Sequence, residues 1–283
     1  MSQAHRHCSL ALVIATSCAT TAPTATAQDP VLACTPEKRT AVALLAAFET
    51  GDEAPFQAYD AEHYIQHNLA AEGGPAGLKN LISILKVMPG PLIKMRPLRV
   101  FQDGDTVVTH SSAYLFGPKA TIDVFRFQAG KVVEHWDNLQ DVPGDTPSGH
   151  TMTDGPFSLE DLDKTEANKI LIKSYVDDVL VHGKLDNISH YFDGDRLVEH
   201  NPTRADGTAS LTAALRTLPR YQGIHQVLGE GNFVLAMSQG KVDGRSTAFY
   251  DLFRVAGGKI AEHWDVVETI PPRSERKNDN GKF

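Results

Sequence analysis

The sequence predicts an α+β protein made of two tandem units, each with three helices packed on a curved four-stranded antiparallel sheet. Two observations carry this prediction. The block Asp123–Asp137 returns as Asp251–Asp265, at an offset of 128 residues (265 − 137). The tetrapeptide Ile65–Asn68 returns as Val198–Asn201, at an offset of 133 residues (201 − 68). A nearly constant offset between similar segments indicates two structural units of similar length.

Length and composition agree with two globular units. The chain has 283 residues, for which two domains are the natural expectation. A net charge of −8, with no basic patch interleaved with aromatic residues, argues against nucleic acid or an anionic membrane surface as a partner. Two of the three cysteines precede residue 19, so a processed chain keeps Cys34 alone. It would therefore have no internal disulfide and no thiolate metal cluster.

The first 27 residues have the pattern of a secretory signal peptide. His5–His7 form a weakly basic start, residues 9–15 are apolar, and Ala25–Ala27 has the small-x-small form of a cleavage site. The apolar stretch is too short for a membrane span. We therefore expect cleavage after residue 27 and a periplasmic or secreted protein. A lipoprotein signal at Cys18 is the alternative.

In the first unit, residues 28–143, helical signals precede strand signals. Thr35–Glu37 supplies a hydroxyl N-cap, a proline and an acid, and Gly51 ends this helix. Two more helices are predicted, over residues 55–60 and from Gly73 to about Val87. Beyond Pro91 the hydrophobic period becomes that of strands. Four strands are predicted in this half of the unit, over residues 93–101, 106–116, 121–128 and 132–142.

The second unit, residues 165–271, repeats this order after a linker. Residues 144–164 are rich in Pro, Gly, Asp, Ser and Thr and form the predicted linker. Helices are predicted over residues 165–182, 185–191 and 210–218, and strands over residues 222–228, 232–239, 246–255 and 259–269. The charged tail, 272–283, is predicted to be disordered. Helices cover one face of each sheet, and we expect the two units to cover each other's second face as an intrachain pseudo-dimer.

The last hairpin of the first unit predicts which side chains share a face. A three-residue loop at 129–131 pairs Arg126 with Glu134, a favourable cross-strand ion pair. The same register sets Asp123 opposite Asp137. Because side chains alternate along a strand, the acids fall on one face and the ion pair on the other. The face of the acids also takes Phe125 and His135, whereas Trp136 and its counterpart Trp264 fall on the interface face.

Two facing carboxylates destabilise a sheet unless something compensates. In a buried pocket such a pair tends to share one proton, which raises one pKa and suits a general acid or base near neutral pH. His135 could orient or neutralise the pair, while His67 and Asn68 could cover the mouth of the pocket. The corresponding residues of the second unit are His200, Asn201, Asp251, Phe253, His263 and Asp265.

An architectural interpretation of the Glu-His-Trp-Asp run stays open. In that interpretation Trp136 lies in an interface, His135 is hydrogen-bonded in the core, Asp137 caps a strand end, and His67–Asn68 stabilises a turn. Metal binding is disfavoured, because the candidate ligands lack the short His-x-His or His-x3-His spacing of a strand or helical site. The sequence has no phosphate loop, nucleophile elbow or nucleotide fingerprint, so no metal and no cofactor is expected.

With these motifs the sequence resembles the SnoaL-like polyketide cyclase group of the nuclear-transport-factor-2-like superfamily, in two tandem copies. The resemblance rests on the order of elements, on His-Asn before the third helix, and on Asp-x-Phe-Arg-x3-Gly-Lys-x2-Glu-His-Trp-Asp. It covers about residues 36–143 and 165–271. It implies two cone-shaped α+β barrels, each with a pocket between sheet and helices. It also implies that Asp137 and Asp265 move a proton in a cofactor-free aldol condensation.

Three functions compete at this point. The first is a cofactor-free acid/base enzyme for a small apolar carbonyl compound, by aldol or cyclase, isomerase or water-adding chemistry. The second is a non-catalytic periplasmic binding module for a small apolar ligand, and the third is a structural role. Fold alone does not choose among them. In the enzyme, Asp137 and Asp265 are bases, Asp123 and Asp251 share their protons, and His67 and His200 polarise the substrate.

The first unit looks better equipped for function than the second. It has His110 and Tyr64 as candidate binding residues, where the second unit has Met237 and Leu197. Arg204 has no basic counterpart nearby in the first unit. We therefore expect the first pocket to be the more competent one.

Overall fold

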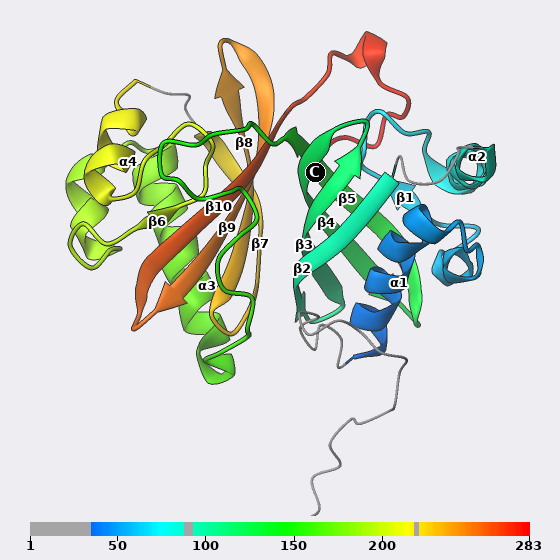
Figure 1. Ribbon diagram of the computed structural model, residues 1–283, viewed down its shortest axis with the longest axis horizontal. Coiled ribbons are helices and arrows are strands. Elements are labelled where there is room, and N and C mark those ends of the chain that lie inside the picture. The colour runs from blue at the N-terminus through cyan, green and yellow to red at the C-terminus, as the bar shows by residue number, and fades with distance from the viewer. Residues whose placement is uncertain (1–34, 88–92, 218–220) are drawn as a thin grey trace, which may run out of the picture.

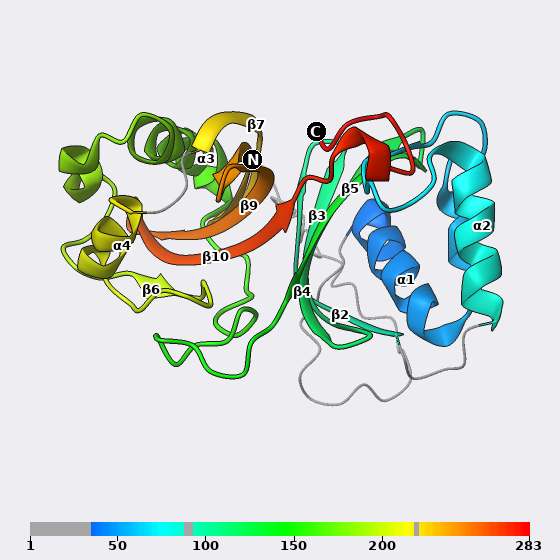
Figure 2. The ribbon, with the colours of Figure 1, turned by 90° about the horizontal axis from the view of Figure 1, so that it is seen from above.

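The computed structural model describes residues 35–87, 93–217 and 221–283 and shows two α+β units joined by an extended linker (Figure 1). In each unit, helices cover the outer face of one sheet. The inner faces of the two sheets are directed toward each other (Figure 2). The predicted signal peptide lies outside the described residues. In the described part of the chain, no helix combines the length and apolarity needed to cross a bilayer.

The first unit contains the predicted helices and strands with small shifts at their ends. Its N-terminal half holds α1 (Pro36–Thr50), the 3-10 helix η1 (Ala54–Ala58), β1 (Ile65–Gln66) and α2 (Gly74–Val87). Its C-terminal half is an antiparallel meander of β2 (Ile93–Asp103), β3 (Thr106–Leu115), β4 (Pro118–Gln128) and β5 (Lys131–Asp141). The predicted N-cap is confirmed, because Thr35 Oγ1 accepts a hydrogen bond from the Lys38 N–H.

The second unit repeats the order of the first. After the short turn η2 (Leu162–Lys164), its helical half holds α3 (Thr165–Tyr175), the π-helical η3 (Val176–Val181), η4 (Leu185–His190), β6 (Val198–Glu199) and α4 (Thr208–Leu215). Its meander is β7 (Tyr221–Glu230), β8 (Phe233–Val242), β9 (Arg245–Ala256) and β10 (Lys259–Thr269), and η5 (Arg273–Glu275) follows. The strand orders β1-β5-β4-β3-β2 and β6-β10-β9-β8-β7 correspond position by position.

Each sheet has five strands, not the four that were predicted. The additional strands, β1 and β6, run parallel to β5 and β10. Each is only two residues long, which is too short for an alternating pattern to be recognised. Both lie directly before a His-Asn pair. They therefore decide which of the following side chains point into the unit.

The turn of the last hairpin differs from the prediction, whereas the register of the acids agrees with it. The turn has two residues with positive φ, Ala129 (50°) and Gly130 (76°), rather than three residues. A register shift after Arg126 compensates for the shorter turn. Asp123 therefore lies opposite Asp137. The second hairpin has the same register around its own two aspartates.

One hydrophobic cluster draws on both sheets and joins the units. Its largest members are Phe101, Ile122, Trp136, Phe233, Tyr250 and Trp264. Both tryptophans thus lie where strand parity predicts them. Asn138 Nδ2 adds hydrogen bonds across the interface, to the carbonyl oxygens of Ala248 (3.1 Å) and Val266 (2.8 Å). The sheet faces opposite the acids are therefore buried between the units.

The prediction of a disordered C-terminal tail is wrong. The last residues pack against the first unit, to which the chain returns in Figure 1. Asn278 Nδ2 donates to the carbonyl oxygens of Asn68 (2.8 Å) and Ala71 (2.9 Å). Lys282 Nζ donates to the carbonyl oxygen of Asp137 at 2.6 Å. Composition does not predict this contact, because the acceptors are backbone carbonyls, which every residue has.

We expect Asn278→Ala to lower the free energy of unfolding by about 2 kcal/mol or slightly more, since it removes two hydrogen bonds to the first unit worth about 1 kcal/mol each and an exposed one from the Asn280 N–H. The matched control is Asn80→Ala on the exposed face of α2, where one surface hydrogen bond of 3.2 Å to Glu72 is lost. The control should stay within about 0.5 kcal/mol of the wild type. Chemical denaturation measures both. Equal losses would mean that the tail does not stabilise the first unit.

Candidate functional site

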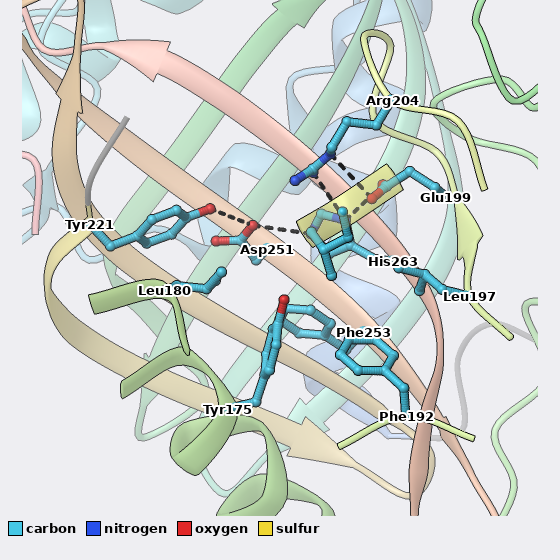
Figure 3. A pocket seen from close by; sticks show the side chains of 11 residues that line it. Tyr175, Leu180, Phe192, Leu197, Glu199, Arg204, Tyr221, Asp251, Phe253 and His263 are labelled. Atoms are coloured by element: carbon cyan, nitrogen blue, oxygen red, sulfur yellow. Dashed lines mark hydrogen bonds and ion pairs between the residues drawn. The ribbon is translucent and has the colours of Figure 1, made fainter. Parts of the chain in front are cut away.

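The acids of the second unit lie in a buried cluster between sheet and helices, and Figure 3 shows two of them, Glu199 and Asp251, beside His263. Asp251 on β9 and Asp265 on β10 face the interior and are 1% and 3% exposed. His263 Nε2 lies 3.1 Å from Asp251 Oδ1, and His263 Nδ1 lies 2.8 Å from Glu199 Oε1. The hydroxyl of Tyr221 donates to Asp251 Oδ1 at 2.9 Å. The imidazole is thus held between two carboxylates.

His263 is a cation in this cluster. Burial by itself lowers the pKa of the imidazole, but Glu199 and Asp251 outweigh it and raise the pKa to about 10. Burial alone would raise the pKa of Glu199, but Arg204 and His263 lower it to about 2. With both N–H groups donated to carboxylates, His263 has no free nitrogen with which to take a proton from a substrate. It orients and neutralises the acids, as the sequence suggests for His135 and its counterpart.

Asp265 combines a raised pKa with an oxygen that has no partner among the described residues. Burial raises the pKa of this carboxyl, against the lowering effect of Arg204 and His263. Its Oδ2 accepts from Asn201 Nδ2 (2.6 Å) and from Arg204 Nη2 (3.1 Å). Its Oδ1 is buried and has no hydrogen-bond partner among the described residues. A carboxyl of this kind suits general acid/base chemistry.

A cavity of about 250 Å³ lies beside Asp265. Its wall is mainly apolar and includes Pro202, Leu215, Val242, Phe249 and Val267. Its polar groups are Gln140, Asn201, Thr203, Arg204, Tyr221 and Asp265, of which Gln140 comes from β5 of the first unit. An apolar wall with a few convergent polar groups is typical of a small-molecule site. The volume falls just below the range of about 300–1,000 Å³ for drug-sized ligands, so the cavity suits a small ligand.

The interior space on the other side of the acids is nearly filled. The region drawn in Figure 3, among Tyr175, Phe192, Leu197 and Phe253, has a volume of about 10 Å³. That is room for about one water molecule. A ligand therefore has space on the Asp265 side of the cluster and not between β9 and α3.

The first unit carries the same cluster with fewer charges. His135 Nε2 lies 3.3 Å from Asp123 Oδ1, and His135 Nδ1 lies 3.1 Å from Gln66 Oε1. Asn68 Nδ2 donates to Asp137 Oδ2 at 2.8 Å. Burial raises the pKa of the Asp123 carboxyl. Oδ1 of Asp137, like its counterpart in the second unit, is buried and has no hydrogen-bond partner among the described residues.

Most of the predicted site residues lie on the acid side of the sheets. Phe125 and Phe253 pack against the two inner histidines, with ring centroids 4.6 and 4.9 Å apart. Tyr64 is buried beside Tyr59 in the core cluster of the first unit, where burial and nearby charges raise its pKa. Asn68 and its counterpart reach the carboxyls directly. The structure thus brings together the two acids, the inner histidine, the asparagine and the phenylalanine of each unit.

The prediction for His67 and His200 is wrong, because neither faces the acids. His67 stacks on Trp136, with ring centroids 4.7 Å apart, and its Nε2 lies 2.8 Å from Glu134 Oε1. His200 repeats this arrangement in the second unit. The reason is strand parity. The preceding residue, Gln66 in the first unit, points inward from the short strand, so the histidine points toward the interface.

His110 also lies on the interface side, which corrects its assignment as a binding residue. Its Nδ1 lies 3.1 Å from Arg99 Nη1, and its ring is 6.3 Å from that of Trp264. The main reason for preferring the first unit is therefore wrong. Arg204, the residue without a counterpart there, is part of the second unit's site.

Sequence reasoning missed three members of the second cluster: Glu199, Arg204 and Tyr221. Glu199 and Gln66 precede the two repeated His-Asn pairs, so the repeat itself contained the signal. Their inward direction depended on strands that were not predicted. Arg204 and Tyr221 come from a loop and from the first residue of β7, where no motif marks them.

We expect the free energy of unfolding to fall as the pH rises from about 6.5 to about 10. Folding raises the pKa of His263 from 6.5 to about 10, so its contribution is full below the lower value and lost by the higher one. His263→Gln removes this contribution. The variant should be less stable than the wild type near neutral pH and should show a shallower decline toward alkaline pH. Parallel curves in denaturant titrations would contradict the assignment of His263 as the cation.

Comparisons with known proteins give fold neighbours only. No protein-family model and no curated protein matches this chain. A candidate ketosteroid isomerase from Kribbella flavida has 16% identity and a TM-score of 0.34, covering 38% of this chain and 84% of its own. An LEH-like epoxide hydrolase from M. tuberculosis has 19% identity and a TM-score of 0.31, covering 37% of this chain and 85% of its own. IdmH, a candidate polyketide cyclase from Streptomyces antibioticus, has 20% identity and a TM-score of 0.31, covering 37% of this chain and 91% of its own. Each match spans about one of the two units.

Proposed function

We propose that this protein is a cofactor-free acid/base enzyme for a small apolar substrate with a carbonyl group, and that its working site is the cavity beside Asp265. One observation carries the proposal. The equivalent oxygen, Oδ1 of Asp265 and of Asp137, is buried and unpartnered in both units. A buried polar atom without a partner costs stability. Its presence at the same place in both units supports a role in binding or chemistry.

The groups around Asp265 fit proton transfer next to a carbonyl. As carboxylate, Asp265 would take a proton from the α-carbon through Oδ1, and the C–H electrons would move onto the carbonyl oxygen as an enolate. As carboxylic acid, it would return the proton to another carbon in an isomerisation. In a ring closure, the enolate carbon would instead attack a second carbonyl, whose oxygen would take the proton. The raised pKa of Asp265 lies closer to working pH than that of an ordinary aspartate, which favours the use of both protonation states.

The cations of the cluster support this cycle. Arg204 and His263 lie beside three carboxyl groups, those of Glu199, Asp251 and Asp265. Two fixed positive charges offset two of the three possible negative charges. The third carboxyl can therefore gain and lose a proton at the least electrostatic cost. Asp265 and Asp251 each have an unpartnered oxygen, and we assign that role to Asp265 because its carboxyl lines the cavity.

We further propose that the two units are tandem SnoaL-like copies forming an intrachain pseudo-dimer, and that the protein is exported. The matching strand orders and the shared hydrophobic cluster support the first part. The second part rests on the N-terminal sequence pattern alone. The intact mass of protein recovered from the exporting host tests it. A mature chain starting at Gln28 is expected. Retained residues 1–27 would contradict export, and a lipid on Cys18 would show export as a lipoprotein instead.

The test of the enzyme uses cyclohex-3-en-1-one, a small cyclic ketone that suits the cavity. Conversion to the conjugated enone is followed by ultraviolet absorbance, and deuterium uptake at the α-carbon is followed by NMR in heavy water. We expect a saturable rate above that of buffer. The second candidate, a binding module, is favoured by the mainly apolar cavity wall. A small molecule retained in native mass spectrometry, with no catalysed exchange in cyclic ketones, would support that alternative and contradict the enzyme.

A further inference from the structure

A second group of titratable side chains lies where the linker crosses the second unit, on the side of β6 that faces away from the acids. His150 and Asp154 belong to the linker, His200 follows β6, and Asp206 precedes α4. The possible ligand atoms of His150, Asp154 and His200 all lie within 4.8 Å of one another. Asp206 Oδ2 lies 3.4 Å from His150 Nε2. Two imidazoles and the carboxylate of Asp154 therefore converge at one place, while Asp206 lies at the other nitrogen of the His150 ring.

His200 is oriented to present its Nδ1 to this place. Its Nε2 lies 2.8 Å from Glu262 Oε1, and the other oxygen of Glu262 accepts from Arg254 Nε at 2.7 Å. Metal-binding histidines commonly donate their second N–H to a carboxylate in this way. The Nδ1 atom faces two oxygens, Asp154 Oδ1 at 2.7 Å and the carbonyl of Thr151 at 2.8 Å. Either a proton or a metal cation must lie among these three atoms.

We propose that these residues form a binding site for a divalent transition-metal ion, and that Zn²⁺ is the ion that fits best. The ligands are His200 Nδ1, His150 Nδ1 and the carboxylate of Asp154, with a water molecule in the fourth position, and Asp206 at His150 Nε2 would orient that imidazole. Imidazole and carboxylate are ordinary zinc ligands. Tetrahedral bonds of about 2.0–2.1 Å place neighbouring ligand atoms about 3.3 Å apart. The separations of 2.7 Å (Asp154 Oδ1–His200 Nδ1) and 3.9 Å (Asp154 Oδ2–His150 Nδ1) bracket that value.

The linker backbone is fixed at this place by contacts that need no ion. The carbonyl oxygen of Asp154 accepts from Trp264 Nε1 at 3.0 Å and from Arg99 Nη2. Gly155 has a φ of +90°, and a Cβ there would lie 2.5 Å from Glu262 Oε1, so the chain passes too close for any side chain. Solvent still reaches two of the three ligand side chains, those of His150 (36% exposed) and Asp154 (45%). An ion would therefore enter a partly formed site.

His67 in the first unit is the counterpart of His200 and shows which contacts hold this histidine without a metal. His67 also stacks on a tryptophan and donates toward a glutamate, and its Nδ1 faces only the carbonyl oxygen of Gly281 at 3.0 Å. In the described part of the chain, no comparable set of ligands surrounds His67. One backbone acceptor is thus enough to hold this histidine. The two aspartates and the second histidine around His200 are additional groups that the packing does not require.

The test measures zinc binding by the full-length protein after treatment with a chelator. Isothermal titration with Zn²⁺ alone is compared among the wild type, His150→Gln and Asp154→Asn. His63→Gln is the matched control, since this histidine is 75% exposed on the first unit. All four proteins keep His5 and His7, so binding by the N-terminal residues cancels in the comparison. We expect the two site variants to weaken one zinc equivalent by at least about tenfold, the smallest effect found even for outer partners of a metal site.

A cobalt titration identifies the kind of site. Co²⁺ bound to His150, Asp154, His200 and a water molecule should give intense visible absorption typical of four-coordination, and His150→Gln should lose it. Thermal unfolding midpoints without metal check that the variants remain folded. If the wild type and His150→Gln bind zinc equally, or if the cobalt spectrum matches that of the free hexaaqua ion, the proposal is wrong. Nδ1 of His200 would then be only a hydrogen-bond partner of Asp154 and Thr151.

Discussion

Asp265→Asn is expected to lower the rate of catalysed proton transfer by about a hundredfold to ten thousandfold, the usual contribution of one general acid/base group. The amide keeps the shape of the side chain but cannot take up or release a proton. The fold should be preserved, because burial already disfavours the ionised form of this residue in the folded state. The rate of cyclohex-3-en-1-one isomerisation measures the effect, and circular dichroism checks the fold.

Two further variants show whether the loss belongs to this site. Asp137→Asn makes the same change at the equivalent position of the first unit, and Asp141→Asn makes it at an exposed strand end, where the aspartate is 83% exposed. Both are expected to retain most of the activity. If Asp137→Asn alone abolishes turnover, the working site is in the first unit. If Asp265→Asn unfolds the protein, the carboxyl is a structural acceptor and the architectural interpretation holds.

Arg204→Met is expected to lower the free energy of unfolding by about 3–5 kcal/mol, the usual cost of removing one partner from a buried ion pair. The guanidinium Nε lies 3.2 Å from Glu199 Oε2, and Nη2 lies 3.1 Å from Asp265 Oδ2, with the arginine side chain only 11% exposed. Its loss leaves excess negative charge in a site with little water. Chemical denaturation at neutral pH measures the change.

The first unit supplies the compensating change. There, Gln66 stands in place of Glu199, and Ala71 stands in place of Arg204, three residues after the asparagine. The double variant Glu199→Gln/Arg204→Met thus reproduces the less charged composition of the first unit. It should recover most of the stability lost in Arg204→Met. If the double variant is as unstable as the single one, the arginine stabilises the unit by packing and not by charge.

The long strands could be predicted together with the faces of their side chains. The Arg126–Glu134 ion pair identified the correct register. The predicted loop was one residue too long, but the register shift after Arg126 compensates for this difference. Alternation over more than ten residues then placed Asp123, Asp137 and both tryptophans correctly. A repeated hydrophobic and charged pattern is strong in long strands because each residue adds to it.

Short and irregular segments could not be predicted in the same way. The face of His67 depends on a two-residue strand whose partner, β5, is about 69 residues away in sequence, as the Gln66–His135 pairing shows. Arg204 reaches Asp265 from a loop, and Asn278 binds backbone carbonyls of the first unit. Each of these contacts is set by tertiary packing rather than by local periodicity. Residues in such segments completed the site and covered the first unit.

The most direct test of the account is the pKa of Asp265 itself, which needs no knowledge of the substrate. Carbon-13 NMR of the side-chain carboxyls, with Asp265 assigned by its absence in Asp265→Asn, follows its titration. Burial and Arg204 act in opposite directions on this group. The account predicts a midpoint above the ordinary aspartate value of about 3.9. A midpoint below that value would show a permanently ionised partner of Arg204, which cannot act as an acid near neutral pH, and would contradict the proposed mechanism.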